Sequence, residues 1–417
     1  MKKYEAYKNS GVEWIGVIPE GWDICKMKHS CSVTDGTHFS PQTSSKGKPY
    51  VTVSNVNHDK IDINGALLIS DEDFNMLVKQ GCQPKIGDVL LSKDGTVGRT
   101  AVVSEDNNFV CLSSLGILSP SNNIESLYLK YMLDSSILQD QMTQEMAGSA
   151  LRRITISKIN DFVIVLPSKE EQQAIASYLD HKVGQIDASV SAINAQIDDL
   201  KAYRQSIISE AVTKGLNPNV PMKDSGIEWI GEIPEDWECL PMKRVLTINN
   251  GKDYKDVQTE SGYPVIGSGG QFAYANEYLY DGEAVLLGRK GTIDKPMYIN
   301  GKFWTVDTMF YAVPHQNVCC RYIYYQAQTI PFGLYSTNTA LPSMTQTDLA
   351  DNPMCFPPLL EQLAIATYLD SKTAKIDATI TSLESQRDDL NALKQSIINE
   401  AVTGKIDVRE WYKSKTE

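Results

Sequence analysis

Several features that would define a class of protein are missing from this sequence. No run approaches the roughly 18 consecutive apolar residues of a membrane-spanning helix. The N-terminus MKKYEAYKNSG has two lysines but no apolar segment behind them, so no secretory signal is expected. The eight cysteines form no C-x-x-C pair and the five histidines show no ligand spacing, which predicts reduced thiols and no metal site. These absences favour a cytoplasmic protein.

Motifs of catalysis are also missing. The sequence contains neither the [DN]-P-P-[YF] motif of amide-clamping methyltransferases nor a G-x-x-x-x-G-K-[ST] phosphate loop. The basic segment Gly288–Thr292 has the wrong spacing for such a loop and fits a hairpin turn better. No Ser/His/Asp or Cys/His constellation has local support. We therefore expect a protein without a catalytic site of its own.

Positive charge is scarce. The 39 Lys and Arg residues face 52 Asp and Glu residues, which gives a net charge of −13, and none of the segments defined below has a net positive charge. Such a chain is unsuited to coating nucleic acid nonspecifically, because that binding depends on neutralising phosphates. A DNA reader whose positive charge is local remains possible.

The chain is an internal tandem repeat. SGVEWIGVIPEGW at 10–22 returns as SGIEWIGEIPEDW at 225–237, which is 215 positions later. EQQAIASYLDHKVGQIDAS at 171–189 returns as EQLAIATYLDSKTAKIDAT at 361–379, which is 190 positions later. The segments between these repeats have diverged, whereas simple drift would spread the differences evenly. This pattern predicts two modules of one architecture with different specificities.

The repeated segments predict two long helices. Ser168 and Glu171 have the spacing of a capping box, Pro357-Pro358 can open the second helix and Gly404 can end it. A 4,3,4,3 apolar spacing over about four heptads then predicts a coiled-coil seam, so the helices should pair with each other. Two arginines in the seam, Arg204 and Arg387, either fix its register or extend from its edge to water. The predicted seam consists of Leu179, Ile186, Ile193, Leu200 and Ile207 in the first helix and Leu369, Ile376, Leu383, Leu390 and Ile397 in the second.

The diverged bodies carry strand and turn signals. Segments 50–56, 87–103 and 162–166 in the first body, and 283–293 and 302–313 in the second, are rich in β-branched or aromatic residues, while helices are expected near 124–147 and 318–329. Each body is therefore predicted to be α+β. Asp94-Gly95-Thr96 and Lys290-Gly291-Thr292 are expected to occupy matching turns.

Basic and polar residues on predicted turns are the best candidates for a binding site. Arg and Lys can reach guanine or phosphate, and Asn, Ser and Thr can complete base contacts. A single Arg is more often a solvated surface charge, but turns that occur twice at matching positions strengthen the case. The candidate DNA-contacting residues are Thr37, His38, Lys93, Thr96, Arg99, Arg152, Arg153, Arg289, Lys290, Thr292, Lys295, Asn338 and Thr339.

These motifs resemble the DNA-specificity subunits of Type I restriction-modification systems over nearly the whole chain. The resemblance rests on IPEGW and IPEDW, on DGTH at 35–38, on GDVLLSKDGTVGR at 87–99, and on LPSKEEQQAIASYLD and PPLLEQLAIATYLD. The second body lacks a DGTH match, so its contacts follow less directly. The resemblance implies a noncatalytic subunit in which each target-recognition domain reads one half of a split DNA site. The resemblance assigns DNA contact to Lys93, Arg99 and the Arg289-Lys290 turn by their positions in the motifs alone.

The resemblance also implies partners. Modification (methyltransferase) subunits, two of them, would bring S-adenosylmethionine for adenine N6 methylation, and restriction (translocase and nuclease) subunits would bring ATP and Mg; no cofactor is expected in this chain. The fold class is α+β, with two tandem target-recognition domains joined by two long helices that form an antiparallel coiled coil in a pseudo-two-fold, circular arrangement. That symmetry would match the dyad of duplex DNA. The competing hypothesis is an acidic scaffold or DNA mimic that binds a methyltransferase without reading DNA.

The predicted domain organisation follows the repeat. Its segments are a lead at 1–21, target-recognition domain 1 at 22–166, a central long helix at 167–221, a repeated lead at 222–236, target-recognition domain 2 at 237–356, and a C-terminal long helix and tail at 357–417.

Overall fold

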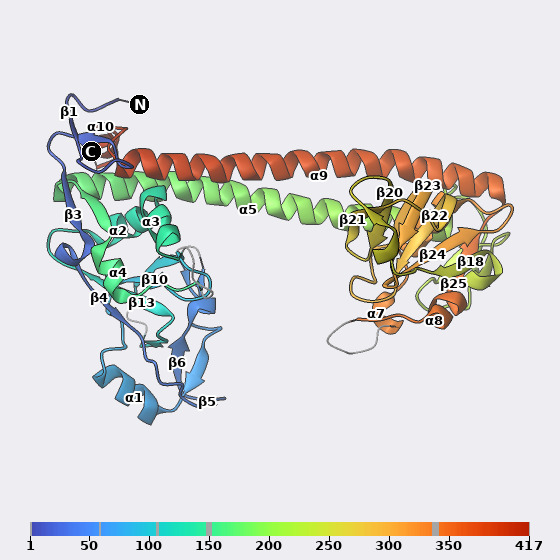
Figure 1. Cartoon of the computed structure of the whole chain (residues 1–417), viewed down its shortest axis with the longest axis horizontal. Helices are drawn as coiled ribbons and strands as arrows, with labels where there is room; N and C mark the ends of the chain where they lie inside the picture. Colours follow the sequence, from blue (N-terminus) through green and yellow to red (C-terminus); the bar gives the residue numbers. More distant parts are fainter. Residues whose placement is uncertain (1, 58–59, 106–107, 147–151, 336–341, 417) are drawn as a thin grey trace. The chain divides into compact units, whose positions relative to one another are not determined.

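A computed structural model describes residues 2–57, 60–105, 108–146, 152–335 and 342–416. The chain divides into two compact units (Figure 1). Unit 1 consists of Met1–Ala192 together with Gln386–Glu417, and unit 2 consists of Ile193–Ser385. The two long helices, α5 (Lys169–Lys214) and α9 (Leu359–Val402), each contribute one part to each unit.

Unit 1 is a mixed α+β unit. Its strands are β1 (Tyr7–Asn9), β2 (Val17–Pro19), β3 (Asp23–Lys26), β4 (Cys31–Asp35), β5 (Thr43–Ser44), β6 (Lys48–Val51), β7 (Val56–Asn57), β8 (Lys60–Ile61), β9 (Leu67–Ile69), β10 (Val89–Ser92), β11 (Thr100–Val102), β12 (Val110–Cys111), β13 (Leu115–Pro120) and β14 (Val163–Leu166). Its shorter helices are η1 (Met27–His29), η2 (Val53–Asn55), α1 (Asp71–Lys79), α2 (Ser126–Asp134), α3 (Ser136–Met146), α4 (Ile156–Asp161) and α10 (Arg409–Thr416).

The main sheet of unit 1 has the strand order β11-β10-β13-β4, and a second sheet has the order β12-β6-β9-β5. β10 is buried along its whole length, because it lies between β11 and β13 inside the sheet. Helices α2 and α3 lie near this sheet in Figure 1. Their buried side chains, including Tyr128 and Leu138, join the largest apolar core of the unit.

Unit 2 repeats this architecture with a larger sheet. Its strands are β15 (Met222–Asp224), β16 (Glu232–Pro234), β17 (Glu238–Pro241), β18 (Leu246–Asn250), β19 (Gln258–Thr259), β20 (Tyr263–Gly267), β21 (Gly270–Ala275), β22 (Tyr280–Gly288), β23 (Met297–Thr305), β24 (Met309–Pro314) and β25 (Pro353–Phe356). Its shorter helices are η3 (Met242–Arg244), η4 (Lys255–Val257), α6 (Cys320–Ala327), α7 (Phe332–Tyr335) and α8 (Gln346–Asp351).

The sheet of unit 2 has the order β18-β24-β22-β23-β20-β21-β19. Its first part, β18-β24-β22-β23, corresponds strand for strand to β4-β13-β10-β11 in unit 1. The predicted α+β character of both bodies is confirmed. The helices expected near 124–147 and 318–329 are also present, as α2, α3 and α6.

Each body is closed by a neck, which we define as the antiparallel pair formed by its first and last strands. In unit 1 the neck is β3 with β14, and in unit 2 it is β17 with β25. A short hairpin precedes each neck, β1 with β2 and β15 with β16. The repeated SG-x-EWIG-x-IPE segments supply the turn and the second strand of each hairpin, so the repeated sequence builds similar supports twice.

The long helices contact each other within each unit. In unit 1, Lys394 Nζ lies 2.8 Å from Asp187 Oδ1, and in unit 2, Arg204 Nε lies 2.9 Å from Asp377 Oδ1. Arg204 also donates to Gln328 Oε1 at 3.0 Å. Arg204 therefore makes specific polar contacts from the seam, which favours the register interpretation over a side chain that simply extends to water.

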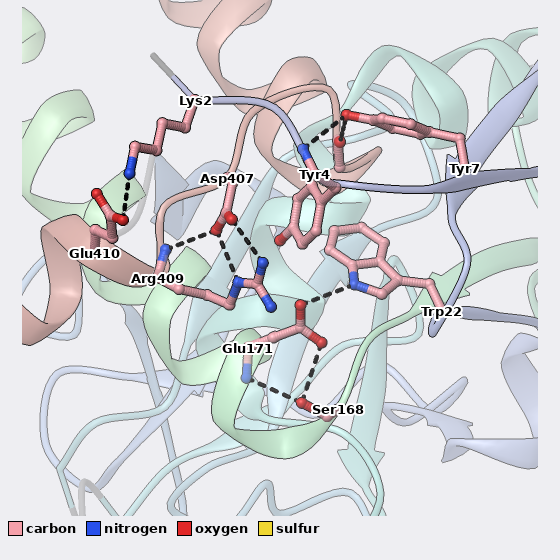
Figure 2. Close-up of polar contacts among 10 residues, drawn as sticks. Lys2, Tyr4, Tyr7, Trp22, Ser168, Glu171, Asp407, Arg409 and Glu410 are labelled. Carbon is pink, nitrogen blue, oxygen red and sulfur yellow. Dashed lines mark hydrogen bonds and ion pairs between the residues drawn. The ribbon is translucent and has the colours of Figure 1, made fainter.

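The N-terminal lead supports the helix ends of unit 1 (Figure 2). The Trp22 indole donates to Glu171 Oε1 at 3.2 Å, near the start of α5, and the Tyr7 hydroxyl donates to Gly404 O at 3.1 Å, just after α9. Trp237 donates to Glu361 Oε2 at 3.3 Å in the same manner in unit 2. The Tyr7–Gly404 contact agrees with the prediction that residues 1–21 complete the end of the second helix.

Two local predictions differ from the structure. The strand expected over 50–56 ends at Val51, because Thr52 and Asn55 form a capping box around the short helix η2. The capping box expected at Ser168 is half formed: Ser168 Oγ accepts from the Glu171 amide at 3.3 Å, but Glu171 Oε1 accepts from Trp22. Its carboxylate thus fixes the lead segment to α5.

Candidate nucleic-acid interface

Three separate stretches of unit 1 meet at one cluster. Asp35 ends β4 and His38 lies in the turn after it, Lys93 and Asp94 lie in the turn after β10, and Arg153 lies in the segment before α4. Asp35 Oδ2 lies 3.2 Å from His38 Nε2 and 3.5 Å from Lys93 Nζ. Asp94 lies 3.3 Å from Lys93 Nζ and 3.0 Å from Arg153 Nε. The structure therefore brings together Lys93, His38 and Arg153, which the sequence predicted separately.

Lys93 is placed differently from its neighbours in this cluster. Its side chain is only 1% exposed and lies between the carboxylates of Asp35 and Asp94. A lysine so enclosed neutralises two acids and holds two turns together. The side chain of His38, by contrast, is 65% exposed.

Backbone geometry fixes the turn after β4. The Gly36 amide donates to Leu115 O and the Thr37 amide donates to Cys111 O at 2.8 Å. A Cβ on Gly36 would lie 2.1 Å from Cys111 O, so only glycine fits this position. The buried Thr37 hydroxyl accepts from the Phe39 amide at 2.9 Å. Thr37 thus shapes the turn that presents His38.

Thr96 and Arg99 follow Lys93 and Asp94 on the connection between β10 and β11. They line a cavity of about 530 Å³ together with Asn391 and Lys394 of α9. Thr96 is exposed, whereas Arg99 Nη1 donates to Asn57 Oδ1 at 2.9 Å. Arg152 is also exposed, and its carbonyl accepts from the Gly95 amide at 3.0 Å.

Unit 2 builds the same arrangement from different side chains. The Arg289 amide donates to Thr308 O, as the Lys93 amide donates to Ser114 O. The Gly291 amide donates to Pro342 O, as the Gly95 amide donates to Arg152 O. The predicted matching of the two turns is confirmed. The equivalence places Arg289 at the position of Lys93 and Lys290 at the position of Asp94.

A residue that sequence reasoning missed completes this site. Asn250, which lies 215 positions after Asp35, is followed by Gly251, whose amide donates to Met309 O. A Cβ on Gly251 would lie 2.0 Å from Val306 O, which repeats the constraint at Gly36. The second body therefore has a counterpart of the DGTH turn that its sequence hides. The repeated segments at 10–22 and 225–237 are 215 positions apart, and adding this offset to Asp35-Gly36 would have identified Asn250-Gly251 as the counterpart.

The unit 2 turns border an open cavity of about 460 Å³, lined by Asn250, Arg289, Lys290 and Ser343 among others. Lys290 is exposed, and the Arg289 guanidinium lies 5.7 Å from the centre of the Phe310 ring. The unit 1 cluster contains two carboxylates paired with Lys93, Arg153 and His38, whereas this site presents two cations and an amide. The two units thus carry different charged and polar side chains at equivalent places.

The remaining candidates are less clustered. Thr292 lies at the end of the unit 2 turn, and Lys295 is exposed three residues beyond it. Asn338 and Thr339 lie outside the residues that the structure describes.

The predicted seam residues lie on the inner side of the long helices. Leu179, Ile186, Ile207, Leu369 and Ile376 are buried. Ile193, Leu200, Leu383, Leu390 and Ile397 are partly buried.

The described residues contain neither a membrane-spanning helix nor a cluster suited to a metal ion. No helix there has the length and apolar character needed to cross a membrane. Among the same residues, no group of three or more His, Cys, Asp or Glu side chains is placed to hold a metal ion.

The fold and the paired turns define a class of protein: a chain with two repeated α+β units, each presenting polar turns of its own, and two long helices shared between the units. A family model described as the Type I restriction modification DNA specificity domain matches residues 19–199 and 234–386. The chain belongs to this family.

Individual relatives agree. The chain is 26% identical over 427 residues to the putative type I restriction enzyme MjaX specificity subunit of Methanocaldococcus jannaschii, covering 95% of this chain and 96% of that protein. It is 21% identical over 434 residues to the StySPI specificity subunit of Salmonella potsdam, covering 94% and 90%. The chain is also similar to a solved chain from work on the structural basis of complex assembly and conformational transition of the type I R-M system. The match covers 93% of this chain and 99% of the solved chain, with a TM-score of 0.68 and 17% identity.

Membership of this family confirms the predicted role. The chain is a noncatalytic DNA-specificity subunit of the Type I class, with two regions of match that correspond to its two bodies. The likeness to the solved structure confirms the fold.

Proposed function

We propose that each unit reads one half of a bipartite DNA site through its paired turns, while the long helices set the distance between the halves. The observation that carries this proposal is the same pair of turns built twice, around Gly36 and Gly95 in unit 1 and around Gly251 and Gly291 in unit 2, with matching backbone hydrogen bonds. A shared frame with different side chains is what two readers of different half-sites require.

The side chains suggest which bases each unit reads. Arg and Lys donate to guanine O6 and N7, and Asn pairs with adenine N6 and N7. Unit 2, with Arg289, Lys290 and Asn250 beside one cavity, therefore suits a half-site that contains guanine or adenine at the positions it contacts. Unit 1 presents His38 beside Asp35, and carboxylates accept from cytosine N4.

The arrangement of the helices is the second part of the proposal. The two helices form an antiparallel coiled coil, and the two units are related by a pseudo-two-fold axis in a circular arrangement. Two observations support this arrangement. Ion pairs join α5 and α9 within each unit, and the equivalent tryptophans Trp22 and Trp237 each hydrogen-bond the glutamate near the start of a long helix. In the cytoplasm, two modification subunits would supply S-adenosylmethionine, and restriction subunits would supply ATP and Mg.

An exposed apolar stripe supports docking of a modification subunit on unit 2. Leu360, Leu363 and Tyr368 of α9 are exposed, and Tyr368 borders a cavity of about 650 Å³ together with Leu216. Tyr178, the repeat equivalent of Tyr368 in unit 1, is instead covered by Trp411 of α10, with ring centres 5.2 Å apart. We propose that a modification subunit covers the face of α9 around Tyr368 in unit 2, as α10 covers the equivalent face of α5 around Tyr178 in unit 1.

An exchange of bodies tests the reading. Residues 22–166 are replaced by the corresponding body of another family member, and the methylated motif is read from the genome of cells that also carry the modification subunits. One half of the motif should change and the other should stay. A motif unchanged in both halves would refute half-site reading by unit 1 and would favour the scaffold or DNA-mimic alternative.

A single substitution tests the unit 2 site. Arg289→Ala should weaken or relax the half-site read by unit 2, at about 1–3 kcal/mol of base discrimination, and leave the other half intact. Lys223→Ala, on the exposed hairpin strand β15 of the same unit, is the control. Equal effects of both substitutions would contradict the assignment.

A further inference from the structure

Two cysteines face each other across the neck of unit 2. β17 and β25 are antiparallel, and their register places Cys239 directly opposite Cys355. Their Sγ atoms are 2.8 Å apart. Opposed residues of an antiparallel pair have Cα atoms about 4.5–5.5 Å apart, within the span of about 4.4–6.8 Å that disulfides bridge. A disulfide here needs no backbone rearrangement.

The internal repeat provides a comparison. The neck of unit 1 has the same antiparallel register, and it places Ile24 opposite Val165 at the equivalent positions. An apolar pair therefore satisfies this fold, so packing alone does not require thiols. The cysteine pair is a chemical difference between two necks of the same shape.

The two thiols differ in accessibility. Cys355 is buried, whereas Cys239 is partly exposed. The Cys355 thiol hydrogen-bonds to Cys239, and this bond lowers the pKa of Cys239, with Lys223 contributing in the same direction. The same interaction, together with burial, raises the pKa of Cys355. Cys239 is thus the thiol that ionises first and meets an oxidant from solvent.

We propose that Cys239 and Cys355 are a redox modification site, at which a hydroperoxide oxidises the pair to a disulfide that closes the neck of unit 2. The Cys239 thiolate attacks one oxygen of the peroxide, the O–O bond breaks, and a sulfenic acid and hydroxide or alkoxide form. The Cys355 sulfur then attacks the Cys239 sulfur; the S–S bond forms as the S–O bond breaks, and the Cys355 proton leaves with the oxygen as water. The two thiols lose two electrons and the peroxide gains them.

A disulfide in this neck would link β17 covalently to β25, which is itself hydrogen-bonded to α6. The carbonyl of Cys355 accepts hydrogen bonds from the Tyr322 hydroxyl at 2.8 Å and from Gln326, both on α6. A disulfide would therefore tie the first strand of the body to the strand that is anchored on this helix. It would also close the long stretch of chain between Cys239 and Cys355, which restricts the unfolded ensemble.

The test uses the full-length, reduced chain treated with hydrogen peroxide under native conditions. Peptide mapping without reductant should show a peptide containing Cys239 joined to one containing Cys355, with two of the eight free thiols lost and reversal by dithiothreitol. The midpoint of thermal unfolding of the oxidised chain should rise by about 5 °C.

Matched variants follow from the repeat. Cys239→Ile with Cys355→Val installs the pair found in unit 1, so the variant should fold, as circular dichroism would report, but lose the linked peptides and the shift. Cys25→Ser, which changes a cysteine of the other neck, should keep both the linked peptides and the shift in the thermal midpoint. Conversely, Ile24→Cys with Val165→Cys should create a second cross-strand disulfide in unit 1.

Three results would overturn the proposal: linkage of other cysteines in place of this pair, survival of the thermal shift in the double variant, or full retention of eight free thiols after peroxide. None of them bears on half-site reading, which the body exchange tests separately.

Discussion

Lys93 and Arg289 occupy equivalent places in the two units, yet their surroundings give them different roles. Lys93 is enclosed by the carboxylates of Asp35 and Asp94. The residues at the corresponding positions in unit 2 are Asn250 and Lys290, so no carboxylate at either position holds Arg289. Arg289 therefore borders the open cavity, where it is proposed to contact DNA. The identity of two neighbouring residues decides whether the cation at this turn is enclosed by carboxylates or lies beside a cavity.

Removal of the buried lysine should destabilise unit 1. Lys93→Met removes the cation that Asp35 and Asp94 share, and leaves only His38 beside Asp35 and Arg153 beside Asp94. We expect a loss of about 3 kcal/mol in the free energy of unfolding. Urea unfolding measures this loss. Lys290→Met, at the exposed equivalent turn of unit 2, should change stability by less than about 0.5 kcal/mol. If Lys93→Met kept full stability but lost DNA recognition, Lys93 would be a reader after all.

Asp407 gives unit 1 a dependence on pH. Its hydrogen bond to the Arg409 side chain lowers the pKa of the Asp407 carboxyl (Figure 2). A lowered pKa in the folded state stabilises the protein above the pKa of the unfolded carboxyl, near 4, and this stability is lost as the pH falls through the folded pKa. Thermal midpoints of Asp407→Asn and the wild type should therefore differ at pH 7 and converge towards pH 3. A constant difference at both pH values would contradict this origin.

At the scale of elements, α10 distinguishes the two units. Its Trp411 packs edge-on against Tyr178 and lies 5.6 Å from the His181 ring. Tyr368, the equivalent of Tyr178, is 36% exposed in unit 2. One repeated helix face is thus covered by the chain itself and the other is open.

Truncation of these two aromatics should have unequal effects. Trp411→Ala uncovers Tyr178 and should cost about 2–3 kcal/mol of folding free energy, less than a fully buried tryptophan because Trp411 is partly exposed. Tyr368→Ala should change stability little and should instead reduce co-purification with the modification subunit. Leu67→Ala, at an exposed site of unit 1, is the control for co-purification. Undiminished co-purification of Tyr368→Ala would remove this docking site.

At the scale of the whole molecule, the helix pair is proposed to act as a ruler. Insertion of one heptad into each helix, after Ala192 in α5 and after Ser385 in α9, adds about 10 Å to both. This length corresponds to about three base pairs at 3.4 Å each. The unread gap of the methylated motif should lengthen by about that amount, with both half-sites unchanged. Insertion into α5 alone breaks the pairing and should abolish methylation, whereas an unchanged gap with both insertions would exclude the ruler.

The sequence predicted elements and their repetition well, because these depend on local spacing. The apolar heptads defined both long helices, and Pro357-Pro358 and Gly404 marked the ends of the second. The similar Asp94-Gly95-Thr96 and Lys290-Gly291-Thr292 segments predicted the matching turns at Gly95 and Gly291. Two details could not be predicted from local spacing. β6 ends at Val51, because the side chains of Thr52 and Asn55 cap a short helix, and Glu171 accepts a hydrogen bond from Trp22, which is 149 residues away.

The sequence by itself determined the elements and their repetition, because apolar periodicity, helix caps and an internal repeat are local features of the chain. It also determined the family, because the family motifs are short local segments. Tertiary structure alone decided which candidates share a site and which cations are enclosed by carboxylates. Burial between two carboxylates separates Lys93 from Arg289, and the carbonyl that Gly251 and Gly36 each approach shows that the two glycines meet the same constraint. These properties depend on neighbours from distant parts of the chain, and only folding brings those neighbours together.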